Sequence, residues 1–347
     1  MFDYLNLLSE KLGRVALFLS IFLGLILIPL TLFGIRKIFG TYKYLMVAFT
    51  SLGVVLAATE TLFHVNLHLY NNGMIYFTLT PILENLEVMA VILSVYAGLY
   101  ATTISLLAVQ FLYRYWALFT LRLLKYFKNW KLIIWVFYCS FFGGLLSSCV
   151  FFLLKKDSVS EEYFQGEMML RYNVSITEIP VLIILPFDSN GKVRWVDLMY
   201  IVMLSCIMGS QYLVMTYCGW MMHSRMELKL EHFSAALKHH HRQLFRTLVL
   251  QITTPTIFLF TPLIIVSYLP LAQLEISFPV RWVFCAISFY PVMDSIIVLV
   301  VVSEYRFAVQ SREFKNPKKS EHCFRIMEKI PGEYKRIAYF RDCIMRQ

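Results

Sequence analysis

Residues 15–35 read VALFLSIFLGLILIPLTLFGI, an uninterrupted run without a charged side chain. At a rise of about 1.5 Å per residue, a helix of this length crosses about 30 Å of hydrocarbon. The run follows Lys11 and Arg14, as in a signal peptide, but it is longer than the typical hydrophobic region of about 7–15 residues. Arg36 and Lys37 follow it in place of a small-residue cleavage site. We therefore interpret it as a first transmembrane helix.

The rest of the chain repeats this composition. Of its 347 residues, 59% are hydrophobic and 16% charged, whereas soluble globular proteins have roughly 45–50% and about 25%. None of the further apolar runs alternates as a membrane β-strand does, and backbone groups in lipid must pair within their own segment. The sequence therefore predicts an all-α membrane protein, a seven-transmembrane helix bundle with spans at about 15–35, 44–63, 86–112, 132–154, 197–220, 247–270 and 282–303.

The net charge of +10 is distributed unevenly. The connections after the first, third and fifth spans and the C-terminal tail hold 3, 5, 5 and 11 Lys and Arg residues, which is 24 of the 32. Such an excess marks the cytoplasmic side of a membrane protein. We therefore expect an extracellular N-terminus (1–14), a transmembrane domain (15–303) and a cytoplasmic basic tail (304–347). The positive charge reflects topology and indicates no nucleic-acid partner.

Two connections differ in character. The outer segment 155–196 has mixed charge and contains Asn173-Val174-Ser175, a candidate N-glycosylation sequence on the expected extracellular side. The cytoplasmic loop 221–246 holds five Lys and Arg residues and five His residues, which suits contact with anionic lipid or a G protein. Consecutive histidines at 239–241 point about 100° apart on a helix, so they do not converge on a metal.

No motif indicates an enzyme. Outside the spans the sequence lacks GxSxG, HExxH and Gly-rich phosphate-loop patterns, and its seven cysteines include no CxxC pair. We expect no catalytic residues, no cofactor and no metal site. A small-molecule ligand and membrane lipid are the expected partners, and dimerisation is left open. Gly143-Gly144 and Ser147-Ser148 in the fourth span favour close helix packing.

The third span ends in Tyr113-Arg114-Tyr115-Trp116-Ala117-Leu118. One interpretation is an interfacial anchor, with Arg114 reaching lipid headgroups among aromatic neighbours. The other is a switch, in which Arg114 holds neighbouring helices together in the resting state and releases them on activation. Composition alone leaves both interpretations open.

The same block resembles the end of the third span in nematode serpentine chemoreceptors of the Str superfamily (serpentine receptor class r, Str/Srj-like). Residues 241–255 at the start of the sixth span are similar to that family, as are Tyr290–Ser295 in the seventh span with Glu304-Tyr305-Arg306 beyond it. The resemblance in layout covers almost the whole chain. It implies a G protein-coupled, olfactory-type receptor in the plasma membrane of sensory cilia. Such a receptor binds a small molecule, for example a volatile one, in the outer half of the bundle and activates a heterotrimeric G protein.

The sequence departs from rhodopsin-like receptors at the positions that matter for switching. Tyr113-Arg114-Tyr115 stands in place of an acidic-Arg-Tyr box, and Tyr290-Pro291-Val292-Met293-Asp294 in place of Asn-Pro-x-x-Tyr. The cysteines of the usual outer disulfide are missing. Asp294 is an intramembrane carboxylate, a kind of residue that usually has a function, and Pro291 interrupts the helix beside it. We predict a switch and G protein coupling role for Tyr113, Arg114, Tyr115, Pro291 and Asp294; a structural contact or ligand contact of Asp294 remains an alternative.

Ligand contacts are predicted only from polarity, aromaticity and depth. Glu60, His64 and His68 are spaced to share one helical face, with His68 expected outside the membrane; metal binding there is an alternative use. The predicted contact residues are Glu60, His64, Tyr96, Tyr100, Gln211 and Tyr268, and the predicted helix hinges are Pro255 and Pro262. A ligand-gated channel with its N-terminus inside and a transporter are the rival functions. The Lys and Arg distribution opposes the first, and the lack of internal repeats opposes the second.

Overall fold

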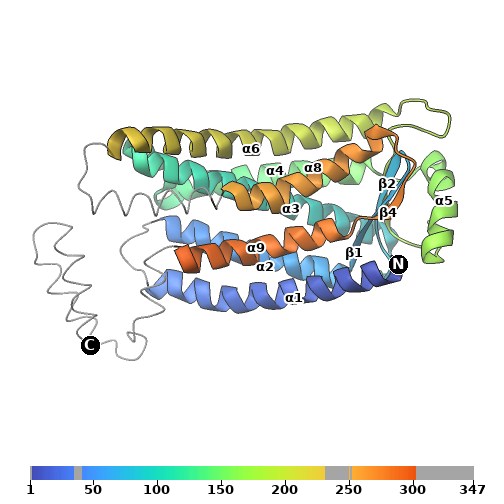
Figure 1. The fold of residues 1–347 in the computed structure, drawn as a ribbon, viewed down its shortest axis with the longest axis horizontal. Helices are drawn as coiled ribbons and strands as arrows, with labels where there is room; N and C mark the ends of the chain where they lie inside the picture. The colour runs from blue at the N-terminus through green and yellow to red at the C-terminus, as the bar shows by residue number, and fades with distance from the viewer. Residues whose placement is uncertain (1, 35–40, 231–249, 251, 302–347) are drawn as a thin grey trace, which may run out of the picture.

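The computed structural model describes residues 2–34, 41–230, 250 and 252–301. Within them it has seven helical segments long and apolar enough to cross a membrane (Figure 1), which confirms the predicted bundle. The segments are α1 with the π-helix η1 (Phe2–Pro29, Leu30–Gly34), α2 (Tyr42–Phe63), α3 (Leu86–Phe119), η3 with α4 (Asn129–Lys131, Leu132–Leu153), α6 (Trp195–Leu230), η4 with α8 and η5 (Thr256–Phe260, Thr261–Tyr268, Leu269–Ala272) and α9 (Trp282–Val301); the 3-10 helix η2 (Leu121–Phe127) follows α3.

Several helices extend beyond the predicted spans. α1 already begins at Phe2, so residues 2–14, expected as a separate N-terminal segment, are helical. α3 continues to Phe119 and α6 to Leu230. Hydropathy marks the lipid boundary, whereas a helix continues until its backbone hydrogen bonds are interrupted. Residues 231–246 of the predicted loop, including the three histidines, and the predicted tail lie outside the described residues.

A four-stranded antiparallel sheet lies at the same end of the bundle as the N-terminus (Figure 1). Its order is β3-β2-β1-β4, and the helix α5 lies on its outer side. These elements were not predicted: segment 155–196 was expected to be only a loop. We call the sheet and α5 together the plug, which comprises β1 (Val65–Tyr70), β2 (Gly73–Thr78), α5 (Ser158–Tyr172), β3 (Val181–Ile184) and β4 (Ser277–Pro279).

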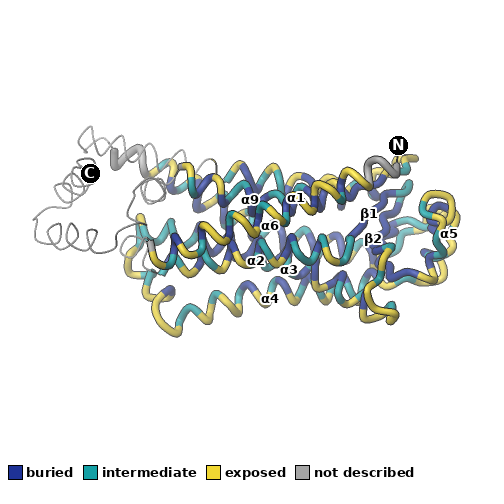
Figure 2. Tube along the Cα trace, turned by 90° about the horizontal axis from the view of Figure 1, so that it is seen from below, coloured by how far each residue is buried: buried dark blue, intermediate teal, exposed yellow. Residues whose placement is uncertain are grey.

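The plug has a hydrophobic layer on each side of its sheet. On one side, strand residues such as Leu67 and Tyr76 belong to the core of the helix bundle. On the other, Ile75 and Phe77 pack with Phe164 of α5 in a second core. Alternate side chains of a strand point to opposite faces, so a strand buried on both faces reads as a continuous apolar run. Figure 2 shows buried residues running through the sheet between α5 and the helices. The plug therefore covers this end of the bundle.

The turn into the sheet corrects one prediction. α2 ends at Phe63, and His64 follows in the left-handed conformation with φ 46°. His68 therefore lies in β1, fully buried, rather than on a helical face with Glu60. The shared face of Glu60, His64 and His68 was a wrong prediction, and so was the exposed position of His68. The physical reason is the left-handed residue, because a helix cannot continue through it.

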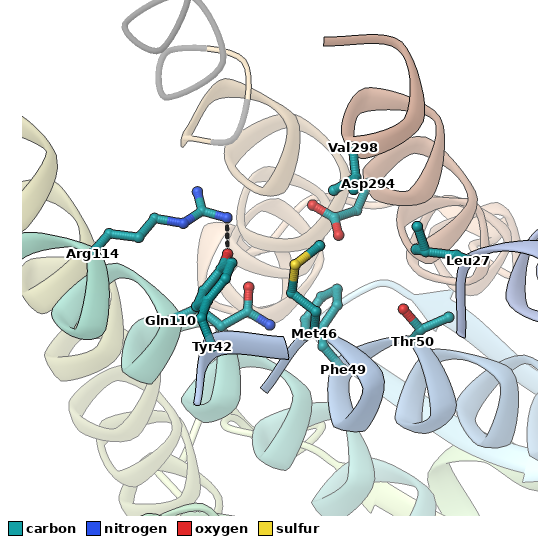
Figure 3. A pocket seen from close by; sticks show the side chains of 9 residues that line it. All are labelled: Leu27, Tyr42, Met46, Phe49, Thr50, Gln110, Arg114, Asp294 and Val298. Carbon is teal, nitrogen blue, oxygen red and sulfur yellow. Dashed lines mark hydrogen bonds between the residues drawn. The ribbon is translucent and has the colours of Figure 1, made fainter. Parts of the chain in front are cut away.

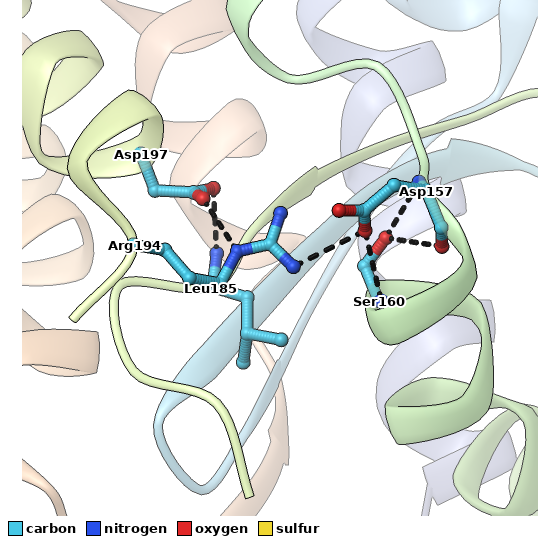
Figure 4. Close-up of polar contacts among 5 residues, drawn as sticks. All are labelled: Asp157, Ser160, Leu185, Arg194 and Asp197. Carbon is cyan, nitrogen blue, oxygen red and sulfur yellow. Dashed lines mark hydrogen bonds and ion pairs between the residues drawn. The ribbon is translucent and has the colours of Figure 1, made fainter. Parts of the chain in front are cut away.

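An ion-pair cluster joins the plug to the bundle (Figure 4). Arg194 donates to Asp197 at the start of α6 (2.9 Å) and to Asp157 before α5 (3.1 Å). The second carboxylate oxygen of Asp197 accepts the backbone N–H of Leu185, just beyond β3. Asp157 in turn caps α5 by accepting the backbone N–H of Ser160. One guanidinium thus connects α5, β3 and α6, three elements distant in sequence.

The small residues of α4 pack against α3. A Cβ atom at Gly143 would lie 2.0 Å from Thr102 Oγ1 and 2.9 Å from the Gly98 carbonyl oxygen. A Cβ atom at Gly98 would lie 2.6 Å from the Gly143 carbonyl oxygen. The two backbones therefore approach as closely as glycine allows. This agrees with the predicted helix packing.

Candidate functional site

Arg114 lies near the end of α3, at the end of the bundle opposite the plug. Its guanidinium donates a hydrogen bond to the Tyr42 hydroxyl, and its central carbon lies 5.0 Å from the centre of the Tyr42 ring. Tyr42 begins α2 and is 5% exposed, while Arg114 is partly buried. A hydrogen bond from a charged donor is stronger than one between neutral groups, and the stacked tyrosine ring adds a cation–π contribution. The geometry therefore favours a contact between helices over a purely interfacial anchor.

A narrow cleft lies beside this contact (Figure 3). Side chains from four helices (α1, α2, α3 and α9) line it: Leu27, Tyr42, Met46, Phe49, Thr50, Gln110, Arg114, Asp294 and Val298. Figure 3 shows Arg114 and Asp294 on opposite sides of the cleft, with Met46 between them in this view. Asp294 lies within electrostatic range of Arg114 and Tyr42. The cleft thus gathers a cation, a carboxylate and the tyrosine hydroxyl that already binds the cation.

The two tyrosines flanking Arg114 have different positions. Tyr113 stacks on Tyr42 with ring centres 5.2 Å apart and meets Phe127 edge-on at 4.9 Å. Tyr115 instead faces α6, where its ring lies 6.2 Å from that of Tyr217. Of the pair, Tyr113 therefore supports the Arg114 contact directly, and Tyr115 joins α3 to α6.

Pro291 lies where α9 crosses α2. A Cβ atom at Gly53 would lie only 2.6 Å from the Pro291 Cβ atom, so glycine is required for this approach. Tyr290 packs edge-on against Phe49 of α2, with ring centres 5.9 Å apart. Asp294 comes one helical turn after Tyr290. The α2–α9 contact therefore holds Asp294 beside the cleft.

The sixth span contains an irregular segment between its two prolines. Pro255 precedes the π-helix η4 and Pro262 follows it at the start of α8. A π-helical turn interrupts the regular hydrogen-bond pattern and is frequent at functional positions. The Tyr100 hydroxyl of α3 donates to the Leu259 carbonyl oxygen in η4 (2.9 Å). This geometry is suited to a helix hinge, which the sequence predicts at the two prolines.

The six predicted ligand contacts are not brought to one place. The Tyr100 hydroxyl is hydrogen-bonded to η4. The Gln211 side-chain oxygen accepts a hydrogen bond from Tyr138 of α4 (2.8 Å). The Tyr268 hydroxyl lies 2.6 Å from Ser205 Oγ, and its side chain is 44% exposed. His64 ends α2. Glu60 and Tyr96 lie within electrostatic range of each other beneath the plug, and Tyr100, one turn along α3, lies within range of Tyr96.

Glu60 has further polar neighbours that sequence reasoning missed. Its Oε2 atom accepts a hydrogen bond from Ser288 of α9 (3.1 Å). Arg281, one residue before α9, lies within electrostatic range of Glu60 and donates to Asn66 of β1 (3.3 Å). Arg281, Cys285 and Ser288 are spaced by four and three residues, so Cys285 and Ser288 share one face of α9 and Arg281 precedes them by one turn. That spacing was the signal available in the sequence.

A second buried polar network lies inside the plug, around His68. Its Nε2 atom is 3.3 Å from Glu167 Oε1 of α5, and its Nδ1 atom is 3.1 Å from the Tyr172 hydroxyl. Ser277 of β4 and Arg171 of α5 both donate to the same Glu167 oxygen. Burial lowers the pKa of His68, although the Glu167 carboxylate partly opposes this. Burial alone would raise the pKa of Glu167, but hydrogen bonds from Ser277 and Arg171 and nearby positive charge lower it.

These shifts predict that the plug becomes less stable in mild acid. The folded state keeps His68 neutral, whereas an unfolded histidine binds a proton below a pKa of about 6.5. Unfolding therefore takes up a proton as the pH falls through that value, and stability decreases. Glu167 adds a further loss only at lower pH, below about 4.3. Hydrogen exchange of α5 amides should be faster at pH 5.5 than at pH 7.5, after correction for intrinsic rates.

His68→Gln is the matched variant for this prediction. Glutamine keeps a donor for Glu167 but does not titrate. The variant should exchange faster than the wild type at pH 7.5 and depend less on pH. An unchanged pH dependence in the variant would assign the effect to another group.

Residues 9–310 match the family described as the serpentine type 7TM GPCR chemoreceptor Str. The chain belongs to the Str family. It is 34% identical over 309 residues to the G-protein coupled receptor str-33 of Caenorhabditis elegans, covering 87% of this chain and 90% of the relative. It is 25% identical to serpentine receptor class r-10 of Caenorhabditis elegans, with 78% and 80% coverage, and 26% identical to that of Caenorhabditis briggsae, with 79% and 81%.

The Str family is one of chemoreceptors rather than enzymes, and this Str chain is a multi-pass membrane chemoreceptor. The predicted resemblance is thereby confirmed. Asn173, the predicted glycosylation position of this Str receptor, is exposed and ends α5 with φ 54°. A glycan could be accommodated there without disturbing the plug.

Proposed function

We propose that this Str receptor binds a small molecule in the half of the bundle beneath the plug and activates a heterotrimeric G protein at the Arg114 end. The observation that carries the proposal is the Arg114–Tyr42 hydrogen bond beside Asp294, in the cleft far from the plug. Spans two, three, five, six and seven supply the ligand site. Of the predicted contacts, Glu60 and Tyr96 are retained as its polar groups.

The mechanism requires two arrangements of the helices. A ligand shifts the equilibrium only if it binds the active arrangement more tightly than the resting one. In the resting arrangement, Arg114 is held by Tyr42 and joins α3 to α2. In the active arrangement, η4 bends, the helix ends beside Arg114 separate, and the basic loop 221–246 meets the G protein. Pro291 and Asp294 adjust the α2–α9 contact in the same step.

The proposed location is the plasma membrane of a sensory cilium, with the plug outside and the Arg114 end in the cytoplasm. The Lys and Arg distribution supports this orientation. An epitope tag at the N-terminus should be stained on intact cells, and one at the C-terminus only after permeabilisation. Asn173→Gln should abolish a mobility shift on deglycosylation. Staining of the C-terminal tag on intact cells would contradict the orientation.

The function itself is tested in cells that carry a G protein activation reporter. Cells expressing the receptor should respond to members of a panel of volatile and lipophilic compounds. Arg114→Ala and Asp294→Asn should reduce the increase that a ligand produces over the unliganded signal, at equal surface expression. Membrane current is recorded in parallel to distinguish a G protein-coupled receptor from a ligand-gated channel. Currents without a G protein signal would identify a channel.

A further inference from the structure

Three polar atoms beneath the plug have no hydrogen-bond partner in the part of the chain that the structure describes. They are Glu60 Oε1, the Tyr96 hydroxyl and Arg281 Nε. Their residues are 0%, 2% and 7% exposed. Leaving one buried polar group unpaired costs about 1–3 kcal/mol, and native structures contain few such groups. Three in one cluster therefore indicate a place for a polar partner.

Other parts of these side chains contact protein. Ser288 donates to the other Glu60 oxygen, and Arg281 donates through Nη1 to Asn66. The Tyr96 ring packs edge-on against Phe284, with centres 5.7 Å apart. Each side chain is thus held by a contact with the protein and keeps one polar atom without a hydrogen-bond partner. This is the arrangement of a prepared site rather than of three unrelated defects.

The unpaired atoms specify the chemistry of the partner. An oxygen of the ionised Glu60 carboxylate only accepts hydrogen bonds and Arg281 Nε only donates one, whereas the Tyr96 hydroxyl does both. The partner must therefore bring both a donor and an acceptor. Glu60 and Arg281 carry opposite charges within electrostatic range, so a charged partner would leave an uncompensated buried charge. A neutral group that donates and accepts fits these conditions, and a hydroxyl is the smallest one.

We propose that Glu60, Tyr96 and Arg281 bind the hydroxyl group of a small neutral alcohol, which donates to Glu60 Oε1 and accepts from Arg281 Nε. This inference rests on the proposed ligand site and names the class of its ligand. An aldehyde of the same carbon skeleton only accepts, so it leaves Glu60 Oε1 unpaired. Because the site is buried, the plug or the neighbouring helices must move to admit the ligand.

The test uses purified full-length receptor and its thermal unfolding, since a ligand stabilises the state that binds it. The probes are the straight-chain alcohols from butan-1-ol to octan-1-ol and the aldehyde of equal length for each. At least one alcohol should raise the unfolding temperature, with an affinity about tenfold or more above that of its aldehyde. No stabilisation by any alcohol, or equal affinities within every pair, would overturn the proposal.

Two variants separate recognition from structure. In Glu60→Gln the amide nitrogen donates to an aldehyde carbonyl, so the preference for the alcohol should fall by about tenfold. Tyr96→Phe should weaken alcohol binding without lowering the stability of the empty receptor, because the hydroxyl it removes is unpaired. Its matched control is Tyr100→Phe, one turn along α3, which should lower stability and keep the preference. An unchanged preference in both Glu60→Gln and Tyr96→Phe would contradict the site.

The same probes distinguish this inference from the proposed function. Alcohol binding without G protein activation would support the alcohol-binding site and refute G protein coupling. G protein activation by compounds that show no alcohol preference would keep the coupling and refute the recognition site.

Discussion

Replacing Gly143 by alanine should strongly destabilise the purified receptor, whereas the same change at Gly144 should have little effect. At Gly143 the new Cβ atom would lie 2.0 Å from Thr102 Oγ1 and 2.9 Å from a backbone oxygen of α3, and at Gly144 it meets no atom within 4 Å. Overpacking of this kind typically costs about 1–3 kcal/mol, and backbone contact places Gly143 at the upper end. The measurement is the thermal unfolding midpoint of each variant.

Gly98→Ala serves as the reciprocal test from α3, because its Cβ atom would lie 2.6 Å from the Gly143 carbonyl oxygen. It should destabilise the receptor about as much as Gly143→Ala. Equal midpoints for the Gly143 and Gly144 variants would show that α3 and α4 do not approach each other here. A dimer contact at Gly143 would instead make the loss of stability depend on receptor concentration.

Tyr42→Phe should raise G protein activation in the absence of ligand at least severalfold. The variant keeps the ring that stacks under Arg114 but removes the hydroxyl that accepts its hydrogen bond. A hydrogen bond to a charged group contributes about 1.5–3 kcal/mol, equivalent to about a tenfold to hundredfold shift between two arrangements. If that bond forms only in the resting arrangement, its loss favours the active one. Nucleotide exchange without ligand measures the effect.

Tyr115→Phe is the matched control for this second prediction. Tyr115 lies one residue from Arg114, and its ring contact with Tyr217 does not need the hydroxyl. Basal exchange should therefore stay near the wild-type rate. An unchanged basal rate in Tyr42→Phe, at equal amounts of folded receptor, would exclude Tyr42 as the group that holds Arg114 in the resting state.

The spans were predictable because each is a long apolar segment, and lipid forces such a segment to form its own hydrogen bonds. The plug was missed because β2 is buried on both faces and lacks alternation, and the short alternating run of β1 directly follows the second span. The available signal was Asn71-Asn72-Gly73 between two apolar runs, a pattern typical of a tight hairpin; the structure places Asn71 in the left-handed conformation with φ 46°.

Some residues of the candidate site could likewise be predicted from the sequence, and others could not. Arg114 and Asp294 stand out in the sequence because charges are rare in spans. Tyr42 does not, since a tyrosine near a span end is usually an aromatic belt residue. Its contact with Arg114 joins positions 72 residues apart, which no local pattern specifies. Arg281 does not stand out either, because a charge just before a span is common, yet it lies within electrostatic range of Glu60 and is 7% exposed.

The proposed coupling runs from ligand binding beneath the plug to G protein activation at the Arg114 end. Its most direct test reconstitutes the receptor in lipid nanodiscs with a purified heterotrimeric G protein and measures nucleotide exchange with a compound that raises its unfolding temperature. We expect that compound to accelerate exchange in the wild type and to have little effect in Arg114→Ala, although both bind it. A compound that binds the wild type without changing exchange, across the sensory G protein classes tested, would contradict the claim.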